Sequence, residues 1–402
     1  MKILLISDVY FPRVNGVSTS IRTFSEQLQR LGHSVHLIAP VYSANTEDEA
    51  WITRVSASSI YFDPEDKLMK FGEILKLLPS LKSQHFNLIH IHTPFVAHYA
   101  GLKLAKLLQI PVVETYHTFF EDYLHHYLPW IPSLAARGLA RLISRRQCNQ
   151  VNAIVAPSQP MLDVLRTYGI KSQAAVIATG LQARSFAQTD GDAFKQKYGI
   201  GSARPMLLYV GRVAFEKNIS FLVSVVKLLS ETMPDVLFVI TGEGPAESSL
   251  HASVKTLGLE HNVQFIGFLD REKELNGCYQ AADIFIFASK SETQGLVLLE
   301  AMAQGTPVVA IAELGTASIL VEGEGAIIAP DNALAFMQKT HELLNDSAQR
   351  EHLGTRAREY AKSKWSAATQ AERMVMFYSD IVEIAIKEKQ PDSSNQAVLN
   401  KR

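Results

Sequence analysis

Short, continuous apolar runs alternate along the chain with amphipathic stretches. An apolar run at Lys2–Ser7 predicts a first strand, the pattern from Ser18 to Leu31 predicts a helix, and Ser34–Ala39 predicts a second strand. Uninterrupted apolar runs are typical of parallel strands that are buried on both faces. Further strands are expected at Leu88–His92, Val112–Tyr116, Ala153–Ala156 and Ala174–Ile177, with helices at Val96–Leu108, Pro132–Asn149 and Ser158–Tyr168. This order predicts an α/β domain built from βαβ units.

A polar, glycine-containing segment at 182–204 interrupts the alternation, which then starts again. Strands are expected at Met206–Val210, Leu237–Thr241, Val263–Ile266, Ile284–Ala288, Val308–Ile311 and Gly325–Ile328, with helices at Asn218–Leu229, Pro245–Leu257 and Leu296–Gln304. We therefore expect two Rossmann-like, doubly wound domains, 1–181 and 182–365, that face each other across a cleft. A last helix at 366–389 is expected to pack back onto the first domain, and the polar tail 390–402 to be disordered.

Composition narrows the class of protein. The 402 residues carry a formal net charge of −1, and 47% of them are hydrophobic, which excludes wholesale disorder and argues against a nucleic-acid partner. Residues 1–180 nevertheless contain 17 Lys plus Arg against 13 Asp plus Glu, and the remainder has 22 against 27. The two cysteines cannot form a disulfide framework, and neither a signal peptide nor a membrane-spanning run is visible, so we expect a cytoplasmic protein.

Two glutamates separated by seven residues, Glu292 and Glu300, flank the start of a predicted helix. A buried strand leads into the loop that holds Glu292. The first N–H groups of the helix, which we expect to stabilise a diphosphate, belong to Gln294, Gly295, Leu296 and Val297. Each carboxylate accepts hydrogen bonds from vicinal hydroxyls, so the pair suits one sugar ring on either side of a diphosphate. Two solvated glutamates at a helix start are the alternative interpretation.

Two cations follow the predicted strand that ends at Gly211. Arg212 and Lys217 stand where open α/β sheets bind ligands, and they are suited to neutralising a leaving diphosphate. Solvated side chains at a strand end are the alternative. Glycines also follow strands at Gly242 in the TGEGP segment, and backbone groups near Gly267 are candidates for contacts with a base. For TGEGP alone, a simple turn between strand and helix is the better interpretation.

The first half of the chain adds Gly16, in the loop after the first strand, and His117, at the end of the strand PVVETY. Glycine lets a phosphate or sugar approach the backbone, and a neutral imidazole hydrogen-bonds to a sugar hydroxyl. Taken alone, a histidine at a strand end such as His117 is more often structural, and His90 and His92 are interpreted as structural or as lying on the acceptor side. Neither a GxGxxG fingerprint nor a Walker sequence occurs, and no residues with metal-ligand spacing are found.

Five of these segments resemble, in their order along the chain, the retaining glycosyltransferases of family four, which have the GT-B fold. The five are NGV in the first loop, YHT, the GR…EKN turn, GEGP and the two spaced glutamates. The resemblance implies that Arg212 and Lys217 bind the donor diphosphate and that Glu300 binds its ribose. It also implies that Glu292 and His117 contact the transferred sugar, and that Gly16 lies near the diphosphate.

The same resemblance implies that the reaction retains the anomeric configuration and needs no catalytic metal. No cofactor is expected beyond the nucleotide diphosphate sugar, which is a co-substrate. The sequence departs from the family at the interdomain crossing, where Gln182 stands at a position that is often Asp. This difference concerns a donor contact or the hinge and leaves the expected fold unchanged.

A lipid acceptor is suggested by the segment YHTFFEDYLHHY and the Arg-rich helix after it, which are similar to bacterial diacylglycerol glucosyltransferases and lipid mannosyltransferases. The pattern at Lys67–Leu78 predicts an amphipathic helix, and a basic stripe is expected on the helix at Pro132–Asn149. The cations proposed to meet an anionic membrane on the cytosolic face are Lys67, Lys70, Lys76, Arg137, Arg141 and Arg145. An ordinary surface helix is the alternative for each of these two segments.

Three functional hypotheses follow. The first is peripheral membrane transfer of a hexose, with UDP-glucose favoured, to a lipid such as diacylglycerol. The second keeps the transfer, from UDP-glucose or GDP-mannose, but changes the acceptor to a soluble sugar, sugar phosphate or protein. The third is a non-catalytic module that binds nucleotide sugars. In each case we expect a monomer or a weak dimer.

Overall fold

The computed structural model describes residues 1–42, 49–60, 63–117, 133–271 and 273–389. The chain divides into two compact units. Unit 1 contains Met1–Ala178 and the residues from Ala368 onward, and unit 2 contains Thr179–Ala367. The division therefore falls three residues before the boundary expected from composition.

Unit 1 is built on a parallel sheet of seven strands. They are β1 (Lys2–Ile6), β2 (Ser34–Pro40), β3 (Ile52–Val55), β6 (Leu88–Ile91), β7 (Val112–Thr115), β8 (Ala153–Ala156) and β9 (Gln173–Val176). Their order in the sheet is β3-β2-β1-β6-β7-β8-β9. The direction of winding reverses between β1 and β6, and doubly wound sheets bind ligands at the carboxyl ends of such a pair.

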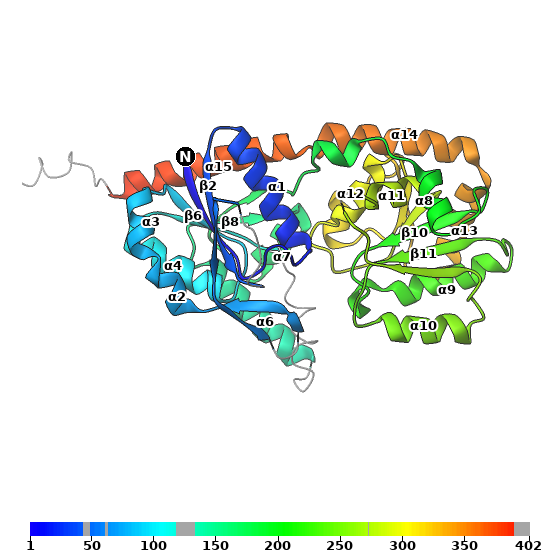
Figure 1. The fold of residues 1–402 in the computed structure, drawn as a ribbon, viewed down its shortest axis with the longest axis horizontal. Coiled ribbons are helices and arrows are strands. Elements are labelled where there is room, and N and C mark those ends of the chain that lie inside the picture. Colours follow the sequence, from blue (N-terminus) through cyan, green and yellow to red (C-terminus); the bar gives the residue numbers. More distant parts are fainter. Residues whose placement is uncertain (43–48, 61–62, 118–132, 272, 390–402) are drawn as a thin grey trace, which may run out of the picture. The chain divides into compact units, whose positions relative to one another are not determined.

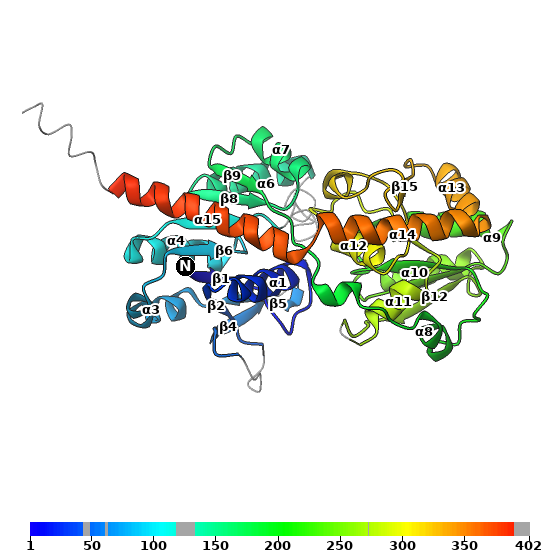
Figure 2. The ribbon, with the colours of Figure 1, turned by 90° about the horizontal axis from the view of Figure 1, so that it is seen from above.

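Helices cover both faces of this sheet. The helices of unit 1 are α1 (Gly16–Arg30), α2 (Phe71–Lys76), α3 (Leu78–Gln84), α4 (Val96–Leu108), α6 (Ser133–Cys148), α7 (Gln159–Thr167) and α15 (Ala367–Lys389). Ile21 of α1 and Met374 of α15 belong to one buried cluster with Leu5 of β1. The C-terminal helix α15 therefore lies over the first sheet beside α1 (Figure 2), as the sequence predicts.

Unit 2 repeats the architecture with six parallel strands. They are β10 (Met206–Val210), β11 (Leu237–Thr241), β12 (Val263–Gly267), β13 (Ile284–Phe287), β14 (Val308–Ala310) and β15 (Ala326–Ile328). The order is β12-β11-β10-β13-β14-β15, so the winding reverses between β10 and β13. Two Rossmann-like sheets in one chain confirm the expected fold class.

The helices of unit 2 lie on both sides of its sheet. They are α8 (Gly191–Lys197), α9 (Ile219–Ser230), α10 (Glu247–Thr256), α11 (Leu275–Ala281), α12 (Leu296–Ala303), α13 (Ala333–Asn345) and α14 (Ser347–Lys364). Helices α9 and α10 lie on one side of β10 and β11, and α14 lies on the other (Figure 1). The polar segment expected to link the domains contains α8, whose Phe194 is buried in the core of unit 2. Most residues of this segment are polar, so the sequence pattern did not predict the short helix that Phe194 attaches to the core.

The helix predicted over Lys67–Leu78 is confirmed only in part, because its first residues form a strand and the helix α2 covers only Phe71–Lys76. Lys67 belongs to β5 (Asp63–Met69), which pairs antiparallel with β4 (Ala57–Ile60), and its ammonium donates to Ser59 Oγ at 2.8 Å. The backbone of Lys70 is extended, and α2 begins only after it. Met69 is buried, and its N–H donates to Asp8 Oδ1 at 3.3 Å, so a distant contact holds the segment as a strand.

Candidate functional site

Unit 2 brings together two of the predicted donor residues from separate segments. Lys217 follows β10 and Glu292 follows β13, and these parallel neighbours end side by side where the winding reverses. Lys217 Nζ lies 2.6 Å from Glu292 Oε1. Their side chains are only 16% and 18% exposed, so solvent screens this pair less than a surface ion pair. The geometry argues against the alternative of independent solvated side chains.

Local backbone structure explains why the two segments meet. Phe215–Lys217 forms a short 3-10 turn, and Asn218 follows it in the left-handed conformation with φ of 56°. Asn218 Nδ2 donates to the carbonyl of Ala288, at the end of the strand that leads to Glu292, at 3.3 Å. Arg212 is half-buried in the segment between β10 and this turn, and its carbonyl accepts from Tyr209 Oη at 3.1 Å.

The glycines of TGEGP are required by backbone packing. Gly242 has φ of 122°, and a Cβ atom there would lie 2.0 Å from the carbonyl oxygen of Gly211. A Cβ atom on Gly244 would lie 2.3 Å from the carbonyl oxygen of Val213. Gly267 lies on the same edge, because its carbonyl accepts from the N–H of Gly242 at 2.8 Å. These glycines let the TGEGP turn support the turn that carries Arg212, which agrees with the simpler interpretation of the motif.

Helix α12 begins as predicted, and the Gln294 side chain just before it is occupied by contacts within unit 2. Gly295 stands at the N-cap with φ of 88°, and Leu296 and Val297 are half-buried in the first turn. The Gln294 side chain is 5% exposed; its Oε1 accepts from the N–H of Thr179 at 2.8 Å and its Nε2 donates to the Thr179 carbonyl at 2.7 Å. Gln294 thus holds the first residue of unit 2 by its side chain and is left with only its N–H for a ligand.

Glu300 lies inside α12 and has partners that the sequence did not indicate. Its carboxylate accepts from Tyr279 Oη at 3.0 Å and forms an ion pair with Arg271. Glu300 itself is 5% exposed, and a carboxylate buried to this extent requires such partners. The burial of α12, an almost wholly apolar helix, was the one available indication that Glu300 faces other side chains rather than solvent.

Unit 1 places His117 at the end of a row of three imidazoles. His117 Nε2 lies 3.1 Å from Nδ1 of His92, and the two rings are stacked. The His92 ring centroid lies 4.1 Å from that of His90. Burial lowers the pKa of His117 to about 4. Burial, together with the nearby His117, lowers the pKa of His90 to about 3. Burial also lowers the pKa of His92 well below its usual value. All three rings are therefore neutral near pH 7.

Sequence reasoning missed Asp8, which follows β1. This fully buried carboxylate accepts from Thr93 Oγ1 at 3.0 Å and from the N–H of Ala97, at the start of α4, at 2.8 Å. Burial raises its pKa to about 6 in spite of these hydrogen bonds. Asp8 joins the carboxyl ends of β1 and β6, the two strands between which the winding reverses.

Gly16 is the first residue of α1, after Asn15, whose side chain accepts from the N–H of Ser18 at 2.9 Å. Gly16 is exposed, and a Cβ atom there would meet no described atom within 4 Å. Packing within unit 1 therefore does not demand glycine at this position. The open space is compatible with a ligand that approaches the backbone.

The predicted basic helix exists as α6, and the three arginines of the expected stripe differ in their surroundings. Arg137 is exposed near the start, Arg141 lies over the ring of Tyr168 at 5.6 Å, and Arg145 packs beside Gly169. Leu142 on the same helix is 61% exposed. On the earlier segment, Lys70 and Lys76 remain exposed, and Lys76 pairs with Glu73 at 2.7 Å. The segment 118–132 before α6 lies outside the described residues.

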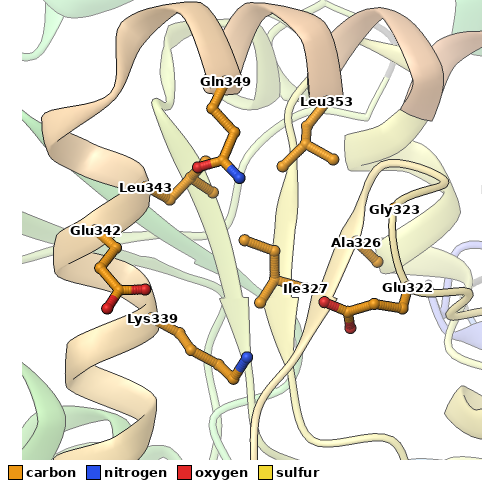
Figure 3. Close-up of a pocket in the computed structure, with 9 residues that line it drawn as sticks. All are labelled: Glu322, Gly323, Ala326, Ile327, Lys339, Glu342, Leu343, Gln349 and Leu353. Carbon is orange, nitrogen blue, oxygen red and sulfur yellow. The ribbon is translucent and has the colours of Figure 1, made fainter.

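None of the helices that the structure describes is long and apolar enough to cross a membrane. A cavity of about 270 Å³ lies between α13, α14 and the edge strand β15 of unit 2 (Figure 3). Its lining consists of Glu322, Gly323, Ala326, Ile327, Lys339, Glu342, Leu343, Gln349 and Leu353. Glu322 and Gly323 precede β15, so the cavity adjoins the amino end of that strand, away from the carboxyl ends that carry Lys217 and Glu292.

Comparison with known proteins covers both units. Residues 14–185 match Glycosyltransferase Family 4, and residues 190–360 match Glycosyl transferases group 1. The chain is 34% identical over 316 residues to alpha-monoglucosyldiacylglycerol synthase of Streptococcus pneumoniae. The aligned region covers 77% of this chain and 71% of that protein. It is 27% identical to the protein of the same name from Acholeplasma laidlawii, over 90% of this chain and 95% of that one.

Among solved structures, sucrose-phosphate synthase from Thermosynechococcus elongatus aligns with a TM-score of 0.78 at 22% identity, over 95% of this chain and 99% of that one. At this identity the likeness concerns the fold. Together with the two doubly wound sheets and the matches in both halves, it shows that the chain belongs to the family-four glycosyltransferases and has the GT-B fold.

Proposed function

We propose that the protein transfers glucose from UDP-glucose to diacylglycerol, with retention of the anomeric configuration and without a catalytic metal. The observation that carries the proposal is the pairing of Lys217 with Glu292 where the winding of the donor sheet reverses. This pair supplies one group for a diphosphate and one for sugar hydroxyls at the same place. The relatives named as alpha-monoglucosyldiacylglycerol synthases support both the sugar and the acceptor.

The ion pair suggests how the donor enters. A diphosphate that reaches Lys217 competes with the Glu292 carboxylate for the ammonium, and it brings more negative charge. Glu292 is then released to accept hydrogen bonds from the hydroxyls of the sugar. Glu300, still held between Tyr279 and Arg271, is positioned to accept from the ribose hydroxyls.

The chemistry then depends on stabilising the leaving group. The acceptor hydroxyl oxygen attacks the anomeric carbon on the face from which the diphosphate departs, and its proton passes to a phosphate oxygen. The bond between the anomeric carbon and the phosphate oxygen breaks, and the glycosidic bond forms. Lys217, Arg212 and the N-terminus of α12 stabilise the charge that develops on the diphosphate. An α-linked product from an α-linked donor would be retention, which the names of the two alpha-monoglucosyldiacylglycerol synthases support.

The lipid acceptor requires that the enzyme reach a membrane surface. We infer peripheral binding at the cytosolic face through α6, whose exposed Leu142 lies among arginines. Such a face attracts anionic lipid and inserts an apolar side chain. The alternative, transfer to a soluble sugar, sugar phosphate or protein, uses the same donor residues and differs only in the acceptor.

A matrix of donors and acceptors tests the proposal. Purified protein is incubated with UDP-glucose, UDP-galactose or GDP-mannose, together with mixed micelles of diacylglycerol or with water-soluble acceptors. We expect one glucosyldiacylglycerol from UDP-glucose by mass spectrometry, with an α-anomeric proton by NMR. Transfer only to a soluble acceptor would favour the second hypothesis, and a β-linked product would refute retention. Donor binding without transfer or hydrolysis would favour a non-catalytic module.

A further inference from the structure

We propose that unit 1 binds an anionic lipid bilayer through two helices together, α4 as well as α6, with Tyr99 and Leu142 entering the headgroup region and basic side chains contacting lipid phosphates. A membrane as the partner rests on the proposed lipid acceptor, whereas the surface itself is independent of the transfer reaction. No sequence motif assigned α4 such a role. We call the residues involved the α4–α6 surface: Tyr99, Lys103 and Lys106 on α4, and Leu142 and Arg146 on α6.

Both helices cover the same face of the first sheet. Successive residues of a strand point to opposite faces, and Val113 of β7 belongs to the buried cluster beneath α1 and α15. Glu114 points the other way, where its Oε2 lies 3.1 Å from Nδ1 of His98 on α4. Tyr116 points in the same direction as Glu114, and its Oη lies 2.9 Å from Ser144 Oγ on α6. Helices α4 and α6 therefore share the face opposite to α1 and α15.

A glutamine at the end of α6 joins the two helices. Gln147 Nε2 donates to the carbonyl of Pro94, just before α4, at 2.7 Å and to Tyr99 Oη, in the first turn of α4, at 3.3 Å. Gln147 is 5% exposed, so these hydrogen bonds are shielded from water. Tyr99 is 53% exposed even though its hydroxyl is anchored in this way. Its ring is therefore held at the protein surface beside α6.

The outer side of each helix presents apolar and basic side chains. On α4, Lys103 follows Tyr99 by four residues and Lys106 follows Lys103 by three, which places them on one side of the helix. Both lysines are exposed. On α6, Leu142 is 61% exposed, and Arg146, four residues later on the same side, is also exposed. Each helix therefore contributes an apolar side chain with cations next to it.

The charge of the two helices has a single sign. The 13 residues of α4 and the 16 residues of α6 contain two lysines and four arginines but no Asp or Glu, whereas the whole chain has 40 acidic residues. Glu73 on α2, which packs beside α4, is paired with Lys76 at 2.7 Å and so does not offset this charge. A basic surface of this kind is complementary to anionic lipid.

The mixture of side chains favours a bilayer over other anionic partners. Tyrosine combines an apolar ring with a polar hydroxyl, which suits the boundary between lipid headgroups and acyl chains. A surface leucine gains free energy from burial among acyl chains but not from contact with a polyanion such as nucleic acid. Tyr99 and Leu142, with lysines and arginines beside them, therefore fit a lipid surface.

Vesicle sedimentation tests the charge of the α4–α6 surface. Full-length protein is mixed with vesicles of phosphatidylglycerol and phosphatidylcholine, or of phosphatidylcholine alone. We expect the double variant Lys103→Gln and Lys106→Gln to bind the anionic vesicles more weakly, by about fivefold for each charge removed. The double variant Lys362→Gln and Lys364→Gln, at exposed positions of α14 in unit 2, removes the same charge and should bind as the wild type does. Melting temperatures establish that both variants are folded. Equal losses in the two variants, or no loss in the first, would overturn the proposal.

Fluorescence measures whether the ring of residue 99 enters the bilayer. Brominated lipid quenches tryptophan that inserts among acyl chains, so the emission that Tyr99→Trp adds to the wild-type signal should be quenched on anionic vesicles. Leu334→Trp, at a position of α13 in unit 2 that is 52% exposed, is the control, and its added emission should persist. Bound protein with unquenched Tyr99→Trp emission would refute the proposal, because another surface would then face the membrane. Expected binding and quenching in a protein that glucosylates no lipid would refute the proposed function and leave the α4–α6 surface intact.

Discussion

The two units share a fold but place their candidate residues in opposite electrostatic surroundings. In unit 2, Lys217 pairs with Glu292, and Glu300 pairs with Arg271, so each charged group is neutralised by a partner of opposite charge. In unit 1, His117 belongs to a row of imidazoles that burial keeps neutral. A diphosphate needs charge, and exchanging one charged partner for another avoids leaving a buried charge alone. Neutral imidazoles donate and accept hydrogen bonds without adding charge, so the two units differ in the kind of contact that their candidate residues can make.

The largest expected effect tests the charged side of this contrast. Lys217→Ala removes the cation that we propose to face the leaving diphosphate, and it breaks the ion pair with Glu292. We expect transfer to fall by about 10²–10³-fold, the size of the loss of one preorganised charge-stabilising group. Initial rates with radiolabelled donor measure the loss. Lys227→Ala, which removes an exposed lysine paired with Glu231 on α9, is the matched control and should leave the rate unchanged. A similar rate in both variants would contradict a role for Lys217 in the reaction.

A smaller effect is expected at Glu300. Glu300→Gln keeps the size of the side chain but removes the ion pair with Arg271, and it should weaken the proposed hydrogen bonds to the ribose hydroxyls. Hydrogen bonds to a charged group contribute about 2 kcal/mol, so the KM for the donor should rise about thirtyfold while kcat changes less. Glu324→Gln breaks the pair with Arg356 on the surface and serves as the control. A fall in kcat with an unchanged KM would instead assign Glu300 to the chemical step.

In unit 1 the expected effect is on stability: the free energy of unfolding should depend on pH through the buried carboxyl group of Asp8. Burial raises the pKa of Asp8 to about 6 from 3.8, so the folded state binds a proton that the unfolded state has released. The stability contributed by this proton is present at low pH and is lost as pH rises through the folded value. Relative to Asp8→Asn, which does not titrate, the wild type should gain about 1 kcal/mol between about pH 7.5 and about pH 5.

Urea denaturation of the two proteins at several pH values measures this difference in unfolding free energy. Asn cannot accept from every donor that Asp8 serves, so the variant has a lower baseline stability, but that deficit does not depend on pH. A constant difference across the range would mean that Asp8 titrates normally in the folded protein. A difference of opposite slope would mean that its hydrogen bonds outweigh its burial.

Much of the fold follows from local pattern. All five residues of β10, Met206–Val210, are buried, and such a strand is recognised in the sequence as an uninterrupted apolar run. The motif spacing likewise indicated the segments that carry Lys217 and Glu292, because each follows a recognisable strand. What the sequence did not provide is the contact between them, which joins residues 75 positions apart.

The failures share a physical cause. Lys67–Leu78 has the spacing of an amphipathic helix, yet Met69 is held in a strand by Asp8, 61 positions away. His90 meets Tyr378 over 288 positions, which no local pattern reveals. Long-range hydrogen bonds override propensity where the competing local structures differ little in free energy. Such contacts occur in both units, as between Lys217 and Glu292, so the arrangement of the candidate residues is not specified by any one segment.

The smallest expected effect concerns the surface of unit 1. Arg137 on α6 is exposed, whereas Arg141 lies over Tyr168 and Arg145 packs beside Gly169. A surface cation contributes about 1 kcal/mol to binding an anionic bilayer, so Arg137→Gln should weaken binding to phosphatidylglycerol vesicles about fivefold in a sedimentation assay. Lys255→Gln, at an exposed position of α10 in unit 2, removes the same charge and should have no effect. Equal losses from both substitutions would mean that the net charge, rather than the α6 surface, governs the attraction.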